Sequence, residues 1–380
     1  MSSYSHILSF GLLFYIFYFV SQQRQKILNK HWWAYLIFPV VCYSFVVGTR
    51  WGWGTDYGWY KLRYENPNYY TYEDPGFRFI NVFLNNLGLS YVGAYITYSL
   101  VFIAGGLILL RSYQQNKYML FLFVLVTLGF STQAIRQAFA HAFVFIAIYF
   151  LNMDSKLKWV YFTVTIPIIY SIHPAALITL VLLVISFFFD RTVPLKTSLV
   201  IYIAIALSTN FLTDIVTANF YQFTEYIPLF DTKFIGYIEN GERWFGSEAV
   251  EEERMQSFLA FVLSTIYYCS VIYLTLTALK YKYNKNVAYI FNVFYIGACG
   301  IKAFLLFEIL LRIVLPLSCL VFIPLGYAIS FFSHKTTYSH LTEKEQFCSK
   351  IALVGVVAYI ILYYGRFLLF YPDSAFVWDK

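Results

Sequence analysis

Apolar and polar positions along this chain fall into long alternating blocks. Apolar stretches of about 17–25 residues, the length that crosses a bilayer as an α-helix, recur along the whole sequence. No low-complexity linker, convincing internal repeat or soluble domain separates them. The pattern predicts a single transmembrane domain over residues 1–380 with about twelve membrane-spanning helices. These are expected at 4–20, 32–49, 90–110, 118–132, 134–151, 157–171, 174–189, 196–212, 257–279, 287–305, 309–332 and 351–371.

Composition agrees with that pattern. The chain is 60% hydrophobic and 12% charged, whereas a soluble domain has about 25% charged residues. We therefore expect an all-α polytopic membrane protein. The net charge of +7 includes no basic cluster that could follow a phosphate backbone, so nucleic acid is not an expected partner. The five cysteines show no metal-binding or paired spacing, and neither a metal site nor a disulfide is expected.

The charges of the loops predict the orientation. One alternating set of connections holds fifteen of the 27 Lys and Arg residues but only four of the 20 Asp and Glu residues. The positive-inside rule makes this set cytoplasmic, so both termini are expected to face outward. The N-terminus has no basic residue before its apolar stretch, unlike a cleaved signal peptide. Two extracytoplasmic segments follow, at about residues 50–89 and 210–256.

A polar stripe is predicted in the sequence FSTQAIRQAFAHAF. Gln133, Gln137 and His141 are spaced i, i+4 and i+8, with Arg136 beside them, which places all four on one side of a helix. The stripe could build an anion site on the permanently charged Arg136. It could equally consist of an arginine reaching the headgroups, with Gln and His bonding neighbouring helices.

A histidine precedes a helix start in the sequence YSIHPAAL. Pro174 suits the first turn of a helix, which places His173 beside an N-terminus that can hold an anion. A structural histidine that bonds a loop carbonyl is the alternative.

Two opposite charges lie within the sequence FEILLRIVLP. Glu308 and Arg312 are spaced i, i+4 in the order that favours an ion pair within one helix. The alternative is that Arg312 is shared with a phosphate of a ligand.

The sequence GTRWGWGTDYGWY follows the second apolar stretch. Trp and Tyr are common at membrane interfaces, but this segment also places Arg50 and Asp56 among glycines. A carboxylate with aromatic faces such as Tyr57 and Tyr60 suits a sugar, and an adjacent arginine suits a phosphate. The chain has no P-loop and no DxD pair for a metal-bound nucleotide-sugar. Arginines at an outward-facing site without a metal fit a lipid-linked pyrophosphate.

The order of these motifs resembles the EpsG family. The segment after the second span is followed by an acidic residue and Pro-Gly, in YEDPGFRFINVFLNNLGLS. Ile135–Ala140 (IRQAFA), SIHPAAL and RIVLP then follow in order. The resemblance covers most of the chain and is strongest between Gly48 and Leu180.

The resemblance implies a Wzy-like polysaccharide polymerase of the bacterial cytoplasmic (inner) membrane, which makes O-antigen, capsule or exopolysaccharide. Such an enzyme transfers a glycan from undecaprenyl pyrophosphate to another lipid-linked repeat unit at the outer face. The implied fold is a C-type glycosyltransferase-like bundle without metal or cofactor. The expected partners are undecaprenyl-pyrophosphate-linked oligosaccharides and the lipid bilayer, with a chain-length regulator and a flippase as further candidates.

The following roles are expected for such an enzyme. Asp56 or His173 is the general base, and Arg136 stabilises the leaving pyrophosphate. The substrate-binding candidates are Arg50, Tyr57, Tyr60, Arg78, Gln137, His141, Glu308 and Arg312, of which Glu308 is expected to orient Arg312.

Two other functional classes stay open. A lipid-linked oligosaccharide flippase or glycan exporter should show repeat symmetry and polar residues deep in the cytoplasmic half. A membrane acyltransferase that modifies a glycan should place a histidine within reach of a cytoplasmic or membrane-borne acyl donor.

Overall fold

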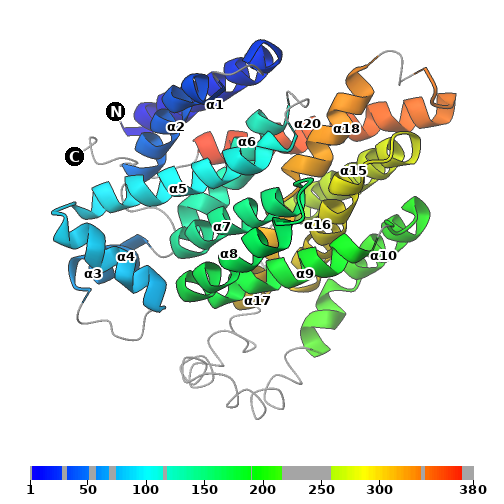
Figure 1. The fold of residues 1–380 in the computed structure, drawn as a ribbon. Helices are drawn as coiled ribbons and strands as arrows, with labels where there is room; N and C mark the ends of the chain where they lie inside the picture. Colours follow the sequence, from blue (N-terminus) through cyan, green and yellow to red (C-terminus); the bar gives the residue numbers. More distant parts are fainter. Residues whose placement is uncertain are drawn as a thin grey trace.

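The structure is a computed structural model that describes residues 2–27, 32–50, 57–67, 74–113, 118–189, 191–215, 258–334 and 339–369. Every regular element in these ranges longer than a single-residue bridge is a helix (Figure 1). The elements of the first half are α1 (Ser2–Ile27), α2 (Trp32–Gly48), α3 (Tyr57–Glu65), α4 (Pro75–Asn86), α5 (Tyr91–Arg111), α6 (Met119–Gln133), α7 (Ile135–Leu151), α8 (Lys158–Ile172), the 3-10 helix η1 (Pro174–Ala176) and α9 (Leu177–Phe188). Those of the second half are α10 (Leu195–Leu207), α15 (Phe258–Tyr281), α16 (Lys285–Ala303), α17 (Glu308–Cys319), α18 (Phe322–Ser333) and α20 (Glu343–Leu369).

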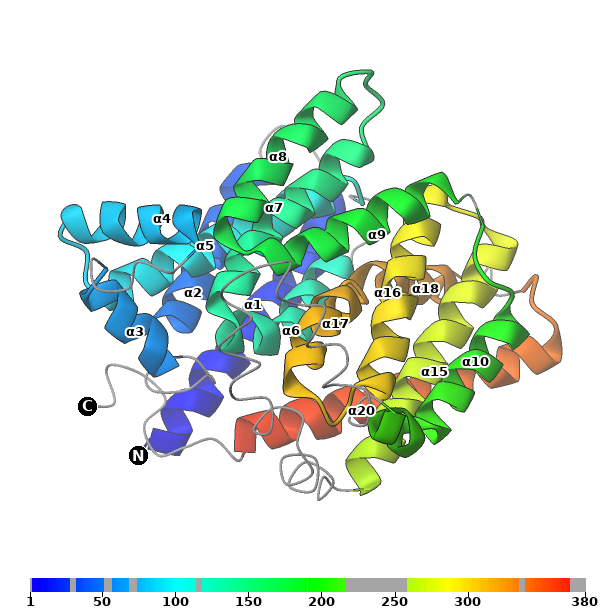
Figure 2. The ribbon, with the colours of Figure 1, turned by 90° about the horizontal axis from the view of Figure 1, so that it is seen from below.

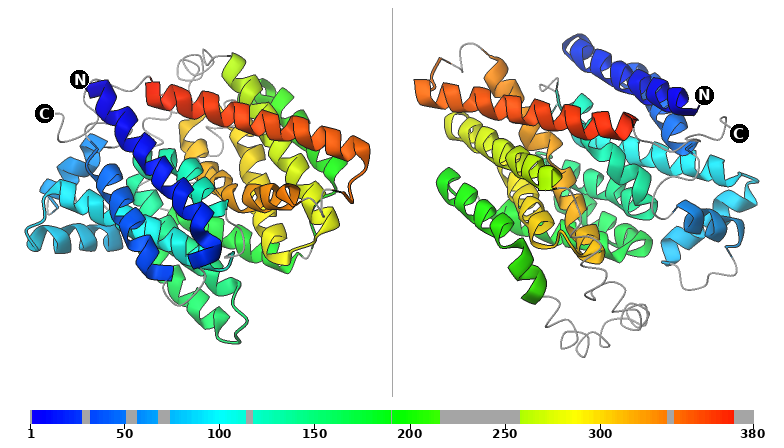
Figure 3. Two further views of the ribbon diagram at one scale, coloured as in Figure 1. Left: turned by 90° about the horizontal axis from the view of Figure 1, so that it is seen from above. Right: turned by 180° about the vertical axis from the view of Figure 1, so that it is seen from behind.

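The helices pack as two groups that share a core. In the first group, α5 packs against α2 and α7, and α7 packs against α8. In the second group, α15 packs against α10, α18 and α20, and α16 packs against α10 and α18. Figure 2 shows α9 and α17 between the two groups, and α9 contacts both α7 and α16. Figure 3 shows α1 and α20, which contact each other, on the same side of the molecule.

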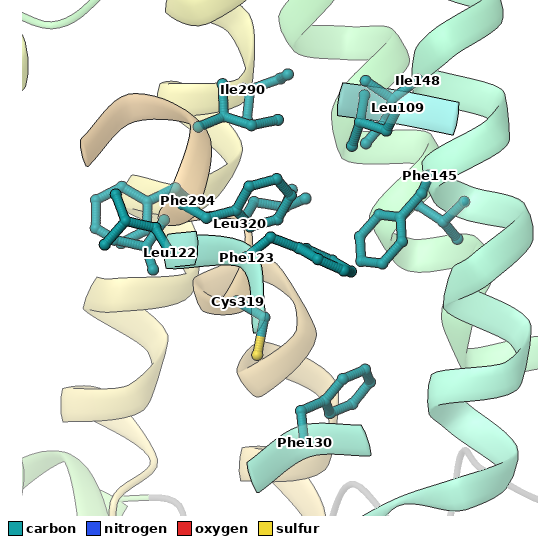
Figure 4. Packing of buried hydrophobic residues seen from close by; sticks show 14 of the residues in the cluster. Leu109, Leu122, Phe123, Phe130, Phe145, Ile148, Ile290, Phe294, Cys319 and Leu320 are labelled. Carbon is teal, nitrogen blue, oxygen red and sulfur yellow. The ribbon is translucent and has the colours of Figure 1, made fainter. Parts of the chain in front are cut away.

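Aromatic side chains fill the core between the groups. Figure 4 shows Phe123 of α6 between Phe145 of α7 and the side chains of Phe294 and Leu320 from the second group. The ring centroids of Phe123 and Phe145 are 5.6 Å apart, in an edge-to-face arrangement that aromatic pairs favour. Such packing positions α6 and α7 relative to the second half of the chain.

A polar network joins the two groups at one end of the bundle. The Tyr113 hydroxyl donates to the Asn286 carbonyl over 3.0 Å. It accepts in turn from Nδ2 of Asn152, over 3.2 Å. The Tyr289 hydroxyl donates to Oδ1 of Asn152 over 2.8 Å. These residues adjoin the connections that the charge pattern predicts to be cytoplasmic, so they mark the end of the bundle opposite the N-terminus of α7.

The prediction of about twelve spans is wrong as a count. In the described ranges, four helices are long and apolar enough to cross a membrane: Tyr91–Arg111, Phe258–Tyr281, Leu310–Ser333 and Glu343–Tyr363. A fifth is present if Leu195–Leu207 and Thr209–Ile215, bent by 63° at their junction, form one span. The all-helical fold and the polytopic class agree with the prediction.

The count differs because several apolar stretches form shorter helices. The helices at Ile7–Gln22, Leu36–Gly48, Met119–Gln133, Ile135–Leu151, Lys158–Ile172 and Pro174–Phe188 have 10–17 residues. At 1.5 Å per residue, a 15-residue helix spans about 22 Å of a hydrocarbon layer about 30 Å thick. The predicted stretches 118–132 and 134–151, for example, are helices with nearly the predicted bounds, separated by a turn at Ala134 (φ −111°, ψ 66°), but they have only 15 and 17 residues.

The two predicted extracytoplasmic segments are described to different extents. Part of the segment at 50–89 forms α3 and α4, which lie beside α5 at the edge of the bundle (Figure 1). The segment at 210–256 lies outside the described residues from residue 216 onward.

Candidate active site

Asp74 places a buried carboxylate at the start of α4. It occupies the N-cap position and its side chain is 6% exposed, yet it makes no side-chain cap hydrogen bond. An N-cap aspartate ordinarily accepts from a backbone N–H of the first turn. Here Oδ2 of Asp74 lies 3.0 Å from Nη1 of Arg136, the second residue of α7. The carboxylate is therefore directed to the guanidinium rather than to its own helix.

His173 approaches the same carboxylate oxygen from a third segment. Its Nδ1 lies 3.9 Å from Oδ2 of Asp74, and its side chain is 20% exposed. This separation exceeds a hydrogen bond but allows an ion pair if the imidazole is protonated. His173 is the C-cap of α8 in an extended conformation, followed by Pro174, which starts η1. Residues 74, 136 and 173, far apart in sequence, thus form one acid–base cluster, named here the Asp74 cluster.

The Asp-Pro-Gly sequence explains how α4 reaches this position. Pro75 occupies the first turn of α4, where its fixed φ suits a helix and its missing N–H costs no hydrogen bond. A Cβ on Gly76 would lie 2.8 Å from Cβ and 2.9 Å from the carbonyl carbon of Ser171. Only glycine therefore lets α4 approach the end of α8, two residues before His173.

The inward face of α4 is anchored by aromatic and polar contacts. The Phe77 ring packs on Tyr60, Tyr98 and Phe139 at centroid distances of 5.9, 5.5 and 6.5 Å. One turn later, the Tyr98 hydroxyl donates to Oδ1 of Asn81. These contacts hold Asp74 against α7 and α8.

Gln137 links the Asp74 cluster to α17. Its Nε2 donates to the carbonyl oxygen of Arg312 over 2.6 Å. That carbonyl would normally accept from the N–H of residue 316, but Pro316 lies inside α17 and has no N–H. The Gln137 amide supplies the missing donor. Because Gln137 directly follows Arg136, this bond holds the backbone of Arg312 close to the start of α7.

His141 is enclosed by protein groups. Its Nδ1 lies 2.8 Å from the Gln137 carbonyl and its Nε2 lies 3.2 Å from the Thr179 hydroxyl. Both ring nitrogens thus face protein partners within a fully buried side chain.

Arg50 is buried in the wall formed by α2 and α5, with 1% of its surface exposed. Its Nη1 donates to the Val47 carbonyl over 2.6 Å, and its guanidinium carbon lies 5.3 Å from the centroid of the Tyr95 ring. The adjacent cavity of about 10 Å³, lined by Arg50, Tyr98 and Ser131 among others, has room for about one water molecule. Arg50 is therefore enclosed within the bundle rather than exposed at an open cleft.

The remaining candidates on α3 and α4 differ in their exposure. Tyr57 and Tyr60 are buried, and the Tyr57 carbonyl accepts from the Tyr95 hydroxyl over 3.0 Å. Arg78 is half-buried on α4, four residues after Asp74. Its backbone N–H donates to the Asp74 carbonyl over 3.0 Å, whereas its side chain makes no hydrogen bond or ion pair with any residue that the structure describes.

Two candidates cannot be placed in the cluster. Asp56 lies outside the described residues. Glu308 begins α17, but its side chain lies outside the described part of the structure. Its pairing with Arg312 stays a prediction.

Asp74 is the residue that sequence reasoning passed over. In the sequence, Asp74 stands out only as the acidic residue before Pro-Gly, in a segment expected to be extracytoplasmic. The signal that could have found it is an aspartate at a helix start, followed by a proline that begins the helix and a glycine that permits close packing.

Comparison with protein families matches residues 33–378, nearly the whole chain, to the EpsG family. The chain belongs to the EpsG family. The matched region includes Asp74, Arg136, His173 and Arg312, so the whole cluster lies within the family domain. No curated protein and no solved structure matches the chain. Membership of the EpsG family suggests a membrane protein similar to a polysaccharide polymerase.

Proposed function

We propose that this EpsG family member is a polysaccharide polymerase that joins lipid-linked oligosaccharide repeat units at the outer face of the cytoplasmic membrane. The observation that carries the proposal is the Asp74 carboxylate between the guanidinium of Arg136 and the imidazole of His173. An acid–base pair next to a fixed cation is what glycosyl transfer from a pyrophosphate requires.

The reaction has two demands. An acceptor hydroxyl oxygen attacks the anomeric carbon of the donor sugar and forms the new glycosidic bond. The bond from that carbon to the pyrophosphate oxygen breaks, and its electron pair leaves with the polyprenyl pyrophosphate. A base must take the hydroxyl proton, and a cation must stabilise the departing negative charge.

His173 is the proposed base. Its side chain is partly exposed, and Asp74 lies where it can orient the imidazole and stabilise the imidazolium that forms. The 3.9 Å separation between Nδ1 and Oδ2 can shorten when substrate binds, because catalytic contacts are often long in the free enzyme. Asp56 is the alternative base.

Arg136 is the proposed leaving-group cation. Its ion pair with Asp74 restrains the guanidinium, whose planar fork can bind two pyrophosphate oxygens together. Arg78 follows Asp74 by one helical turn and adds a second cation. Arg312, whose backbone is held by Gln137, is the proposed third.

The other candidates are assigned to the support of the site. Arg50, Tyr57, Tyr60 and His141 are buried and bonded or packed within the bundle. We assign these four residues to positioning the wall behind the cluster rather than to direct sugar contacts.

The proposal is tested with purified protein in detergent and a purified undecaprenyl-pyrophosphate-linked repeat unit. We expect a ladder of longer glycans and release of undecaprenyl pyrophosphate, both lost in His173→Gln. A flippase would give no polymer in detergent, where no sealed compartment exists. An acyltransferase would add acyl groups from an added donor without lengthening the glycan. Absence of polymer from well-folded protein would overturn the proposal.

A further inference from the structure

The outward face of α4 carries a stripe of large apolar side chains. Phe79 is 70% exposed and Phe83 is 52% exposed. Their rings stack on each other, with centroids 6.4 Å apart. Leu87, at the next helical spacing, is also exposed. On the neighbouring helix α3, Trp59 adds a further exposed aromatic ring.

The opposite face of α4 is satisfied by the bundle. Phe77, Asn81 and Leu84 are buried, so the helix has a definite inner side. Helical spacing places Arg78 between the two faces, on the side where Asp74 precedes the helix. The element thus has a protein-facing side, an apolar outer side and a charged flank.

Helix α4 is too short to cross a membrane. Its 12 residues span about 18 Å, against a hydrocarbon layer of about 30 Å. It packs against α8, whose exposed side chains Val164 and Tyr170 form an apolar outer surface of the bundle. Figures 1 and 2 both show α3 and α4 at the edge of the molecule. The apolar stripe of α4 therefore continues the surface that this membrane protein presents to lipid.

We propose that α4 is an interfacial helix, with Phe79, Phe83 and Leu87 inserted in the outer leaflet of the bilayer. An amphipathic helix with aromatic side chains on its apolar face and a basic flank lies in the plane of the interface. Trp59 of α3 would rest at the same level, where tryptophan is favoured. The occupant of this face is the lipid of the leaflet, not a partner protein.

This placement has a consequence for the Asp74 cluster, and that consequence rests on the proposed function. Because Asp74 caps α4, the cluster lies at the depth of the phosphate groups of the outer leaflet. A polyprenyl pyrophosphate that diffuses laterally holds its own phosphates at that depth. The lipid-linked substrate would then reach Arg78 and Arg136 from within the leaflet, without leaving the membrane.

Membrane depth is tested without any activity measurement. Single cysteines at Phe79, Val164 and Asn66 are introduced into a cysteine-free background and labelled with an environment-sensitive fluorophore. The proteins are reconstituted in phosphatidylglycerol–phosphatidylethanolamine vesicles. Quenching is measured with lipids that carry a nitroxide near the headgroup or near the chain end, and with iodide in the water. Asn66 is the aqueous control, since it is exposed at the end of α3.

We expect the Phe79 probe to be quenched most by the shallow nitroxide, and the Val164 probe by a deeper one. The Asn66 probe should respond to iodide alone. A Phe79 probe that behaves like the Asn66 probe overturns the interfacial placement, whatever the protein catalyses.

Substrate delivery is tested with the double variant Phe79→Ser/Phe83→Ser, which leaves the Asp74 cluster intact. We expect the apparent KM for a long-chain polyprenyl substrate to rise about tenfold, while kcat for a short-chain, water-soluble analogue stays unchanged. Equal losses with both substrates would overturn lateral delivery. Thermal unfolding of the same samples identifies a folding defect, in which case single Phe79→Ser decides by the same comparison.

Discussion

Gln137 donates from its side-chain amide to the main-chain carbonyl of Arg312, 175 residues away, over 2.6 Å. The bond exists because Pro316 deprives that carbonyl of its donor within α17. This single hydrogen bond thereby joins two separate sequence motifs, IRQAFA and RIVLP. The same contact connects the helix that bears Arg136 to the helix that bears Arg312.

The first prediction tests this link by a double-mutant cycle. Gln137→Leu should leave the Arg312 carbonyl without a donor and lower the free energy of unfolding by about 1–3 kcal/mol. Pro316→Ala restores an N–H within α17, so adding it to Gln137→Leu should recover much of the loss. Thermal unfolding in detergent measures both. Equal losses with and without Pro316→Ala would show that Gln137 acts through another contact.

The second prediction concerns the charge of Asp74. Asp74→Asn keeps the shape of the side chain but removes the negative charge that faces Arg136 and His173. Saturated turnover in the polymerisation assay should fall by about 10²–10⁴-fold, because the proposed base His173 would lose the carboxylate that orients it and stabilises its protonated form. Asp154→Asn, an exposed substitution near the opposite end, should have no effect. Normal turnover in Asp74→Asn would contradict the proposed pairing of Asp74 with a catalytic His173 and favour Asp56 as the general base.

The third prediction separates charge from geometry at Arg136. Arg136→Lys keeps the ion pair with Asp74 available but loses the planar fork for two phosphate oxygens. Polymer formation should fall at least tenfold while the protein accumulates normally. The exposed Arg111→Lys is the matched control. Full activity of Arg136→Lys would limit this residue to a generic positive charge, and loss of the protein would indicate a structural role.

The fourth prediction concerns the close approach of α4 to α8. The Cβ of Gly76→Ala would lie 2.9 Å from the backbone carbonyl carbon of Ser171, a contact that side-chain rotation cannot relieve. Overpacking of this kind costs about 1–3 kcal/mol and should displace Asp74 from His173. Gly58→Ala meets no atom within 4 Å and should be neutral in both thermal unfolding and activity. Unchanged activity in Gly76→Ala would show that the cluster tolerates movement of α4.

The fifth prediction tests the orientation derived from loop charge. A single cysteine at Ser90, before α5, should react with an impermeant thiol reagent in intact spheroplasts. A single cysteine at Ser339, before α20, should react only after the membrane is permeabilised. The five native cysteines must first be replaced. Labelling of Ser339 in sealed cells would reverse the topology and move the Asp74 cluster to the cytoplasmic face.

Apolar length was sufficient for the helical membrane class, and Pro174 was sufficient for the expectation that His173 lies just before a helix start. They were insufficient for the span count, because apolar stretches such as 118–132 and 134–151 form helices of only 15 and 17 residues. A membrane-spanning helix needs about 20 residues.

The sequence by itself also determined that Gln137 and His141 share one side of a helix, since 3.6-residue periodicity follows from local hydrogen bonding. The prediction that Gln133 lies on that same helix is wrong, because Gln133 ends α6 and the chain turns at Ala134 before α7 begins. Only the tertiary structure decided what that side meets. Gln137 faces a carbonyl orphaned by Pro316, and His141 faces Thr179. Likewise, Asp74 stood in the sequence as one acidic residue before Pro-Gly. Its partnership with Arg136 and His173 arises because α4, α7 and α8 converge, and such convergence depends on burial and packing between residues distant in the chain.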